Sequence, residues 1–299
     1  MNNKLVMTLL AGWLAFTLPA LGQAGNTSPE EMIKLAKALK YQQGAVDLRG
    51  GLAKVTLPPE FRLLGPDDAE TVLVKLWGNP PSGQKPLGML IPTGMTPFTS
   101  NCWVVTISYD EDGYVKDDDA SKINYDDLLK TMQKGVEENN KKRREQGYPA
   151  ITLLGWATPP RYDAANHKMY WAKRVKFEGE EAETLNYNIR MLGRKGVLEL
   201  NAIAQVDQLD EVQRQTPAIL GMVDFKEGSR YADFDPKVDK VAEYGLAALV
   251  VGGIAAKAGL FKLLLVGLTA GWKFVVIGLA AFVGFFKKLF KGKRDTTGS

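Results

Sequence analysis

The chain is poor in the residues that build disulfides and metal sites. Its 299 residues include one cysteine and one histidine. A lone thiol cannot form an internal disulfide, so an exported domain must rely on its hydrophobic core for stability. Zinc sites made of cysteine and histidine need several such ligands, and we predict no metal site and no cofactor. Cys102 lies in the stretch NCWVVTISY, which is typical of a strand and predicts a buried thiol.

Other signals of chemistry are also absent from the sequence. There is no glycine-rich loop of the kind that binds phosphate, no nucleophile elbow of the hydrolase type and no internal repeat. The chain has a net charge of +4, but Lys4 carries one positive charge, and residues 257–299 carry eight cations and one acid. Residues 25–256 therefore hold a net charge of −4, which argues against nucleic acid as a partner.

The sequence has a long apolar run near its C-terminus. Residues 263–286 contain fourteen Leu, Ile, Val and Phe residues around a central Lys273. Each such apolar residue gains about 0.3 to 0.6 kcal/mol on insertion, and a central lysine costs about 3 kcal/mol, so the sum favours a transmembrane helix. A second register that begins at Lys273 needs a locally thinned bilayer, and the sequence does not decide between the two. The alternative is an apolar helix buried in a soluble core.

The two ends of the chain predict its orientation. Lys4, the apolar run after it and the small residues that follow make residues 1–24 a predicted signal peptide, or else an uncleaved N-terminal anchor. Residues 287–299 are rich in lysine, which predicts a cytoplasmic tail in contact with inner-membrane lipid. We therefore expect a single-pass protein of the bacterial inner membrane, with residues 25–239 forming a periplasmic domain.

Two further features near the C-terminus concern the membrane. The apolar part of residues 240–262 is too short for a crossing, and we interpret this stretch as an interfacial or re-entrant segment that leads into the span. Gly267 and Gly271 lie one helical turn apart, a spacing that lets two membrane helices pack closely. This pattern favours self-association, although glycine is common in membrane helices.

The exported part has the pattern of an α+β domain. Apolar residues at helical spacing predict helices in SPEEMIKLAKALK, PDDAETVLVKLW and NYDDLLKTMQKGVEENNKKRRE. Short strands are expected on both sides of Arg49, and a strand, a turn at Asp112 and a shorter return strand in WVVTISYDEDGYV. Further strands are expected in PAITLLGWA, KMYWAKRVKF, LNYNIRML and VLELNAIAQV, the last two joined by a turn at 193–196. We predict an antiparallel β-meander packed with helices, plus the C-terminal transmembrane helix.

Polar residues alternate with apolar ones in the last two of these strands. They are Asn186, Asn188 and Arg190 in one strand, and Glu199 and Asn201 in the next. Asparagine is a poor strand former, so propensity does not explain these positions. We interpret the five residues as a hydrogen-bonding surface for a polar ligand such as a glycan or a peptide. The alternative is a solvated sheet face, which antiparallel sheets commonly have.

Two weaker candidates for chemistry involve the histidine and an acidic run. Arg161, Asp163 and His167 are close in sequence and could form an acid–base cluster with a nearby hydroxyl. A Ser-His-Asp hydrolase would have to use this histidine, although a lone histidine at a strand start is usually structural. The acidic residues within 110–119 suggest calcium, but their spacing is not that of an EF-hand, and we expect a turn there instead.

Several stretches of the exported domain resemble a known bacterial family. They include GYVKDDDASKINYDDLL, GWATPPRYD, HKMYWAK, LNYNIRMLGRKGVLELNA and DKVAEYGLAAL, and with shorter ones they span most of the domain. The sequence is similar to the predicted membrane-anchored proteins of domain of unknown function 2167. The resemblance implies an envelope protein of a Gram-negative-type bacterium. It implies no catalytic residues, because the family has no assigned activity.

The targeting signals, the acidic domain and the lack of catalytic motifs together favour one function. This is a non-enzymatic periplasmic module, tethered by its C-terminus, that binds an envelope protein or glycan. The alternative is an envelope hydrolase that uses His167 or the acidic cluster within 110–119. A third hypothesis is a subunit of a membrane complex that assembles through Gly267 and Gly271.

Overall fold

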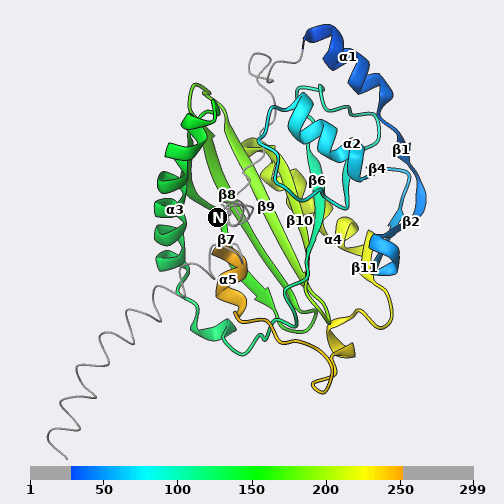
Figure 1. Ribbon diagram of the computed structural model, residues 1–299, viewed down its shortest axis with the longest axis vertical. Helices are drawn as coiled ribbons and strands as arrows, with labels where there is room; N and C mark the ends of the chain where they lie inside the picture. The colour runs from blue at the N-terminus through cyan, green and yellow to red at the C-terminus, as the bar shows by residue number, and fades with distance from the viewer. Residues whose placement is uncertain (1–27, 252–299) are drawn as a thin grey trace, which may run out of the picture.

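The computed structural model describes residues 28–251, which form two antiparallel sheets with helices packed on them (Figure 1). The larger sheet has eight strands in the order β1-β4-β5-β6-β10-β9-β8-β7, and the smaller has three in the order β11-β3-β2. The strands are β1 (Tyr41–Gln42), β2 (Gly44–Leu48), β3 (Ala53–Leu57), β4 (Phe61–Leu64), β5 (Gly88–Pro92), β6 (Val104–Asp110), β7 (Ile151–Asp163), β8 (Lys168–Phe177), β9 (Glu183–Leu192), β10 (Val197–Gln205) and β11 (Val223–Phe225). The α-helices are α1 (Pro29–Ala38), α2 (Pro66–Glu70), α3 (Tyr125–Glu145), α4 (Leu209–Met222) and α5 (Leu246–Val251), and α2 continues into a π-helix at Thr71–Leu76.

The predicted α+β class and the antiparallel meander are confirmed. β7, β8, β9 and β10 follow one another along the chain and lie side by side in the larger sheet. The turn at 193–196 joins β9 to β10, and Gly193 N donates to Gly196 O at 2.8 Å. Residue 196 has to be glycine, because a Cβ there would collide with the carbonyl oxygen of Asp110. This tight hairpin fixes the register of β9 against β10.

Local sequence signals define where the helices begin. Ser28 caps α1, and its side chain accepts a hydrogen bond from Glu31 N at 3.2 Å. Asn124 caps α3 in the same way and accepts from Asp126 N and Asp127 N at 3.1 and 3.2 Å. The first turn of α3 is acidic and its last turn is basic, which suits the helix dipole. Both helices therefore begin where the sequence predicts.

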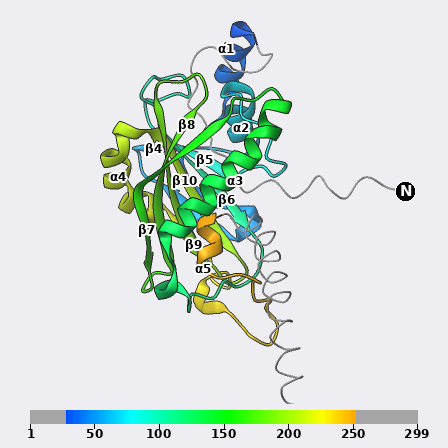
Figure 2. The same cartoon turned by 90° about the vertical axis from the view of Figure 1, so that its left-hand side faces the viewer.

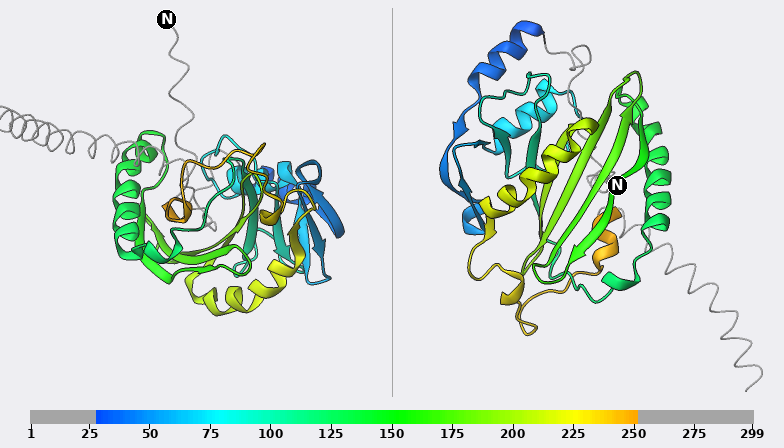
Figure 3. Two further views of the ribbon diagram at one scale, coloured as in Figure 1. Left: turned by 90° about the horizontal axis from the view of Figure 1, so that it is seen from below. Right: turned by 180° about the vertical axis from the view of Figure 1, so that it is seen from behind.

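Helices cover both faces of the larger sheet, which is curved (Figures 2 and 3). The sheet curves around α5, which lies with α3 on the concave face, whereas α4 lies on the convex face. On the convex face, one hydrophobic cluster joins α4, the smaller sheet and the larger sheet. On the concave face, a second cluster joins α3 and α5 to the sheet, and a third lies under α1 and α2.

The segment after β6 departs from the predicted hairpin. The chain bends at Asp112, but Tyr114 forms a single parallel bridge with Val241 instead of starting a return strand. Tyr114 N donates to Lys240 O at 2.8 Å, and Ala242 N donates to Tyr114 O at 2.8 Å. The predicted return strand does not form, because the backbone N–H and C=O of Tyr114 pair with the C-terminal segment and not with β6.

The predicted interfacial segment 240–262 lies partly within the described residues. Its first part contains α5, whose buried side chains belong to the hydrophobic cluster that also includes α3. These contacts extend the folded domain beyond Asp239 as far as Val251. The remainder, 252–262, lies outside the described residues.

The other predicted membrane features also lie outside the described residues. They are the signal peptide 1–24, the span 263–286 with its two registers around Lys273, the pair Gly267 and Gly271, and the tail 287–299. Within residues 28–251, no helix has both the length and the apolar character that crossing a membrane requires.

Candidate functional site

The sheet register brings the five polar residues of the predicted binding surface together on the concave face. Arg190 pairs with Glu199, and Asn188 pairs with Asn201, across β9 and β10. Cross-strand partners project to the same side of a sheet, and Asn186, two residues before Asn188, shares that side. Arg190 Nε lies 2.7 Å from Glu199 Oε1 and forms an ion pair with it. We call these five residues the polar cluster.

The polar cluster is largely buried, so the alternative of a solvated sheet face is wrong. Asn186, Asn188 and Arg190 are 1, 4 and 9 % exposed. Glu199 and Asn201 are partly exposed. Burying a polar group costs free energy unless the group is hydrogen-bonded. Whether each buried side chain has a hydrogen-bond partner within the protein therefore shows whether the cluster serves only the fold or can also bind a ligand.

The polar cluster separates two hydrophobic clusters on the concave face. In β10, Val197 belongs to the cluster that contains α3 and α5, and Ile203 belongs to the cluster under α1 and α2. Glu199 and Asn201 occupy the two positions of that face between them. Apolar packing is thus interrupted at one place in the middle of the sheet.

Hydrogen bonds within the polar cluster leave some of its atoms unpaired. Asn188 Nδ2 donates to the backbone oxygen of Asn186 at 2.9 Å, and Asn201 Nδ2 donates to Asn186 Oδ1 at 3.3 Å. Asn186 Nδ2, Asn201 Oδ1 and the neighbouring Trp171 Nε1 are buried and have no hydrogen-bond partner among the described residues. A buried atom left unpaired costs about 1 to 3 kcal/mol, so these atoms are available to a ligand or to water.

Strand β6 adds two hydroxyl groups that the sequence did not identify. Thr106 and Ser108 lie opposite Asn201 and Glu199 in the register of β6 with β10. Ser108 Oγ donates to Glu199 Oε2 at 3.4 Å, and Thr106 Oγ1 donates to the backbone oxygen of Asn201 at 3.4 Å. This pairing joins segments far apart in the chain, so no local pattern marks these residues.

Strand β8 adds an indole and an ammonium group. Trp171 lies opposite Asn188, and the centre of its ring is 5.0 Å from the guanidinium carbon of Arg190. Lys173 is two residues further along the same face and is partly exposed. Burial, helped by Arg190 and opposed by Glu199, lowers the pKa of Lys173 from 10.5 to about 8.

The sequence of β8 does contain a signal for this extension. Alternation places Met169, Trp171, Val175 and Phe177 on one face, and Lys173 interrupts this apolar series. The register shows that this is the concave face, where Trp171 meets the asparagines of β9. A lysine inside an otherwise apolar face is a pattern that could have indicated a buried polar site.

The single histidine lies in the loop between β7 and β8 and contacts an aspartate from a distant segment. His167 Nδ1 lies 3.3 Å from Asp117 Oδ2. The Tyr162 hydroxyl donates to the same carboxylate oxygen at 2.6 Å and lies 3.3 Å from His167 Nδ1. Partial burial raises the pKa of Asp117, but the hydrogen bonds from Tyr162 and His167 outweigh it, and the net pKa is lowered. Burial and the bond to Asp117 raise the pKa of Tyr162.

The predicted grouping of Arg161 and Asp163 with His167 does not form. Asp163 accepts two backbone hydrogen bonds within its own loop, at 3.1 and 3.3 Å, and so closes a turn. The guanidinium of Arg161 lies over the ring of Tyr170, 5.1 Å from its centre. The three residues are close in sequence, but the side chains of Asp163 and Arg161 contact other groups and not His167.

The acidic residues within 110–119 serve separate partners. The Tyr244 hydroxyl donates to Asp112 Oδ2 at 2.9 Å, and Leu246 N donates to Asp119 Oδ1 at 3.1 Å. Within residues 28–251, no three His, Cys, Asp or Glu side chains gather in a way that could hold a metal ion. Asp112 and Asp119 instead hold the C-terminal segment against the loop that follows β6.

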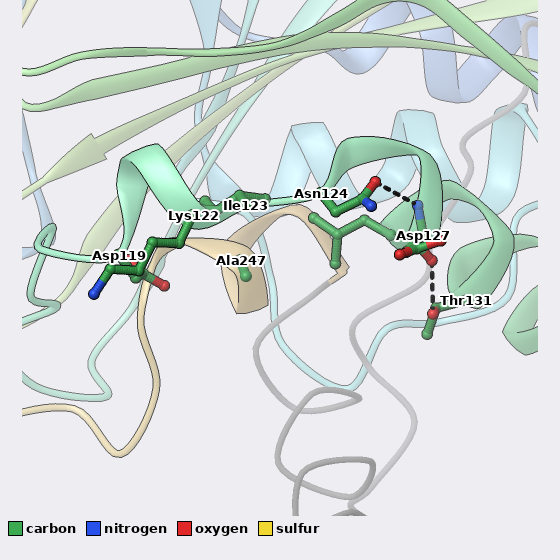
Figure 4. A pocket seen from close by; sticks show the side chains of 8 residues that line it. Asp119, Lys122, Ile123, Asn124, Asp127, Thr131 and Ala247 are labelled. Atoms are coloured by element: carbon green, nitrogen blue, oxygen red, sulfur yellow. Dashed lines mark hydrogen bonds between the residues drawn. The ribbon is translucent and has the colours of Figure 1, made fainter.

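A small pocket lies between the first turn of α3 and α5 (Figure 4). Its volume is about 250 Å³. Asn124 Oδ1 accepts from Asp127 N at 3.2 Å, and Thr131 Oγ1 donates to the backbone oxygen of Asp127 at 2.9 Å (Figure 4). These polar groups already stabilise the start of α3, so the polar cluster remains the stronger candidate for binding.

A family model described as "Protein of unknown function (DUF2167)" matches residues 40–283. The chain belongs to this family. No curated protein matches the chain. Among solved structures, the solution structure of cyanobacterial PsbP (CyanoP) from Synechocystis sp. PCC 6803 shows 10 % identity and a TM-score of 0.35, and covers 70 % of this chain and 100 % of that one. A TM-score this low does not establish a shared fold.

Membership of the DUF2167 family confirms the resemblance seen in the sequence. It assigns no activity to any residue, and a membrane anchor stays a prediction for this chain.

Proposed function

We propose that this DUF2167 domain is a non-enzymatic module, tethered to the bacterial inner membrane, that binds a polar envelope ligand through its concave face. The main support is the polar cluster, which is largely buried and retains unpaired hydrogen-bonding atoms. Proteins pair nearly all of their buried polar groups. Several unpaired atoms at one place on a sheet therefore favour a ligand that completes them.

The chemistry of the cluster suits binding better than catalysis. Amides, an ion pair and an aromatic ring converge there, which is typical of ligand sites. With a pKa of about 8, Lys173 is mostly charged at pH 7 and adds a cation. Ser108 Oγ does contact a carboxylate, but its hydrogen bond to Glu199 is long, at 3.4 Å, and Arg190 forms an ion pair with the same carboxylate.

The tether is supported by the sequence. Residues 1–24 are the predicted export signal, and residues 263–286 are the predicted span, followed by a basic tail. The folded domain reaches Val251, so 252–262 separate it from that span. This short link holds the domain near the periplasmic surface of the membrane.

Photo-crosslinking in intact cells tests the binding function. A photoreactive residue is placed in the full chain at Ser108, a partly exposed position beside Glu199, and at the exposed Asn101 as the control. We expect a covalent adduct with an envelope component at position 108 and none at position 101. A folded and abundant protein without an adduct at position 108 contradicts the proposal.

Protease access tests the orientation. Added to spheroplasts, a protease is expected to remove the domain and spare the tail, because the domain faces the periplasm in this proposal. A domain that is degraded only after the cells are lysed lies on the cytoplasmic side, and the orientation is then wrong.

The contact between His167 and Asp117 favours a second candidate, an envelope hydrolase. An imidazole held by a carboxylate is the base part of many hydrolytic sites, and the two side chains lie 3.3 Å apart. The hydroxyl that contacts His167 belongs to Tyr162, and the raised pKa of this hydroxyl makes it a poor nucleophile. His167→Gln and Asp117→Asn separate the candidates: both variants abolish a cellular phenotype if the protein is a hydrolase, and both leave crosslinking at position 108 intact if it is a binding module.

A further inference from the structure

The ligand class can be narrowed from two amides of the polar cluster that contact each other. We infer that the concave face takes a glycan whose sugars carry acetamido groups. This inference rests on the proposed function and adds the chemistry of the ligand. Asn186, Asn201 and the neighbouring Trp171 carry it, since each has a buried atom without a partner among the described residues.

The pair of Asn186 and Asn201 presents one unpaired donor and one unpaired acceptor. Asn201 Nδ2 donates to Asn186 Oδ1 at 3.3 Å, which leaves Asn186 Nδ2 and Asn201 Oδ1 unpaired within the part of the chain that the structure describes. Exchanging oxygen and nitrogen in both amides reverses this bond and again leaves one donor and one acceptor. An acetamido group has one N–H and one C=O, so it satisfies both.

Trp171 adds a third unpaired atom beside the two amides. The register places Trp171, Asn188 and Asn201 in one row across three neighbouring strands. Trp171 is 1 % exposed, and its Nε1 is a further donor that lacks a partner among residues 28–251. A sugar carries hydroxyl groups besides its acetamido group, and a hydroxyl oxygen can accept from this donor.

The polar cluster is open on one side. Ser108, Glu199 and Asn201 are partly exposed, whereas Asn186 and Trp171 are buried. A ligand that enters along β6 and β10 meets the hydroxyl and the ion pair first. The unpaired amide atoms of Asn186 and Asn201 are themselves buried, so binding has to open this side of the cluster.

The position of the cluster in the sheet disfavours a peptide ligand. Extended peptides commonly bind by pairing their backbone with a free strand edge. β6, β8, β9 and β10 are interior strands, each paired on both sides. The concave face therefore offers side chains, and the ligand has to be recognised by them.

Calorimetric titration of the purified full chain in detergent micelles tests the inference. The probe is an oligomer of N-acetylglucosamine, and the matched control is a glucose oligomer of the same length and linkage. We expect the acetylated oligomer to bind at least about tenfold more tightly. Asn186→Ala and Asn201→Ala are each expected to weaken its binding about tenfold, while Asn101→Ala at an exposed position retains full affinity.

The outcomes separate this inference from the proposed function. Equal affinity for the two oligomers overturns the acetamido inference and keeps the binding function. If neither oligomer binds and position 108 crosslinks to a peptide or protein, the ligand is a peptide and the inference is again overturned. If neither oligomer binds and no adduct forms, both proposals fail and water is what pairs the buried atoms. The comparison of ligands uses the unmodified protein, so it holds even if a variant misfolds.

Discussion

The two faces of the larger sheet are made by the same strands but are filled in different ways. Leu200 and Asn201 are neighbours in β10 and project to opposite faces. Leu200 is fully buried in the single hydrophobic cluster of the convex face. Asn201 lies between the two hydrophobic clusters of the concave face, beside amides with unpaired atoms. The convex face therefore contributes stability, and the concave face keeps hydrogen-bonding capacity that folding does not use.

The sharpest test of this difference compares the two neighbours in β10. We expect Leu200→Ala to lower the free energy of unfolding by about 2 to 5 kcal/mol, because it leaves a cavity. Asn201→Ala is expected to lower it by about 1 kcal/mol or less, since one hydrogen bond is lost together with an unpaired buried oxygen. Urea unfolding of the full chain in detergent measures both. Equal losses of unfolding free energy in the two variants would show that the two faces contribute equally to stability.

The ion pair of the concave face gives the next largest effect. Arg190 and Glu199 have side chains that are 10 and 23 % exposed, so removing one partner leaves a poorly solvated charge. We expect Arg190→Met to lower the free energy of unfolding by about 2 to 4 kcal/mol, and the double variant with Glu199→Gln to recover most of this loss. A double-mutant cycle measures the coupling. A double variant as unstable as Arg190→Met alone would mean that the pair acts through its packing.

Lys173 makes the concave face sensitive to pH. Because its pKa is lowered from 10.5 to about 8, the unfolded chain takes up a proton at a higher pH than the folded chain does. The free energy of unfolding therefore falls by up to about 3 kcal/mol as the pH drops from 10.5 to 8 and is constant below that. Lys173→Met removes this fall. Urea unfolding at several pH values measures the difference, and parallel pH profiles for the two proteins would rule out the lowered pKa.

Labelling of Cys102 tests whether the hydrophobic cluster under α1 and α2 excludes solvent. The polar cluster, by contrast, is partly exposed. The thiol is fully buried in the hydrophobic cluster under α1 and α2, and burial raises its pKa to about 12. We expect no measurable labelling by a maleimide at pH 8 until urea unfolds the chain. Rapid labelling of the folded protein would show that this cluster opens readily.

The sequence predicted the strands of the meander and the members of the polar cluster, because period-two alternation is a local property. It could not show that the cluster is buried. The C-terminal segment with α5 packs on the same face, and it is held by contacts such as Tyr114 with Val241 and Leu246 with Asp119, which are far apart in the chain. For the same reason the partner of His167 was missed, since Asp117 comes from a loop 50 residues away.

The attachment of the C-terminal segment has a mechanical consequence. Any tension on the chain beyond Val251 enters the domain at Leu246, bonded to Asp119, and at Val241, bridged to Tyr114. These anchor points lie on the loop that continues from β6, and β6 pairs directly with β10. A pull from the C-terminal side is therefore transmitted through β6 to β10, one of the strands that carry the polar cluster.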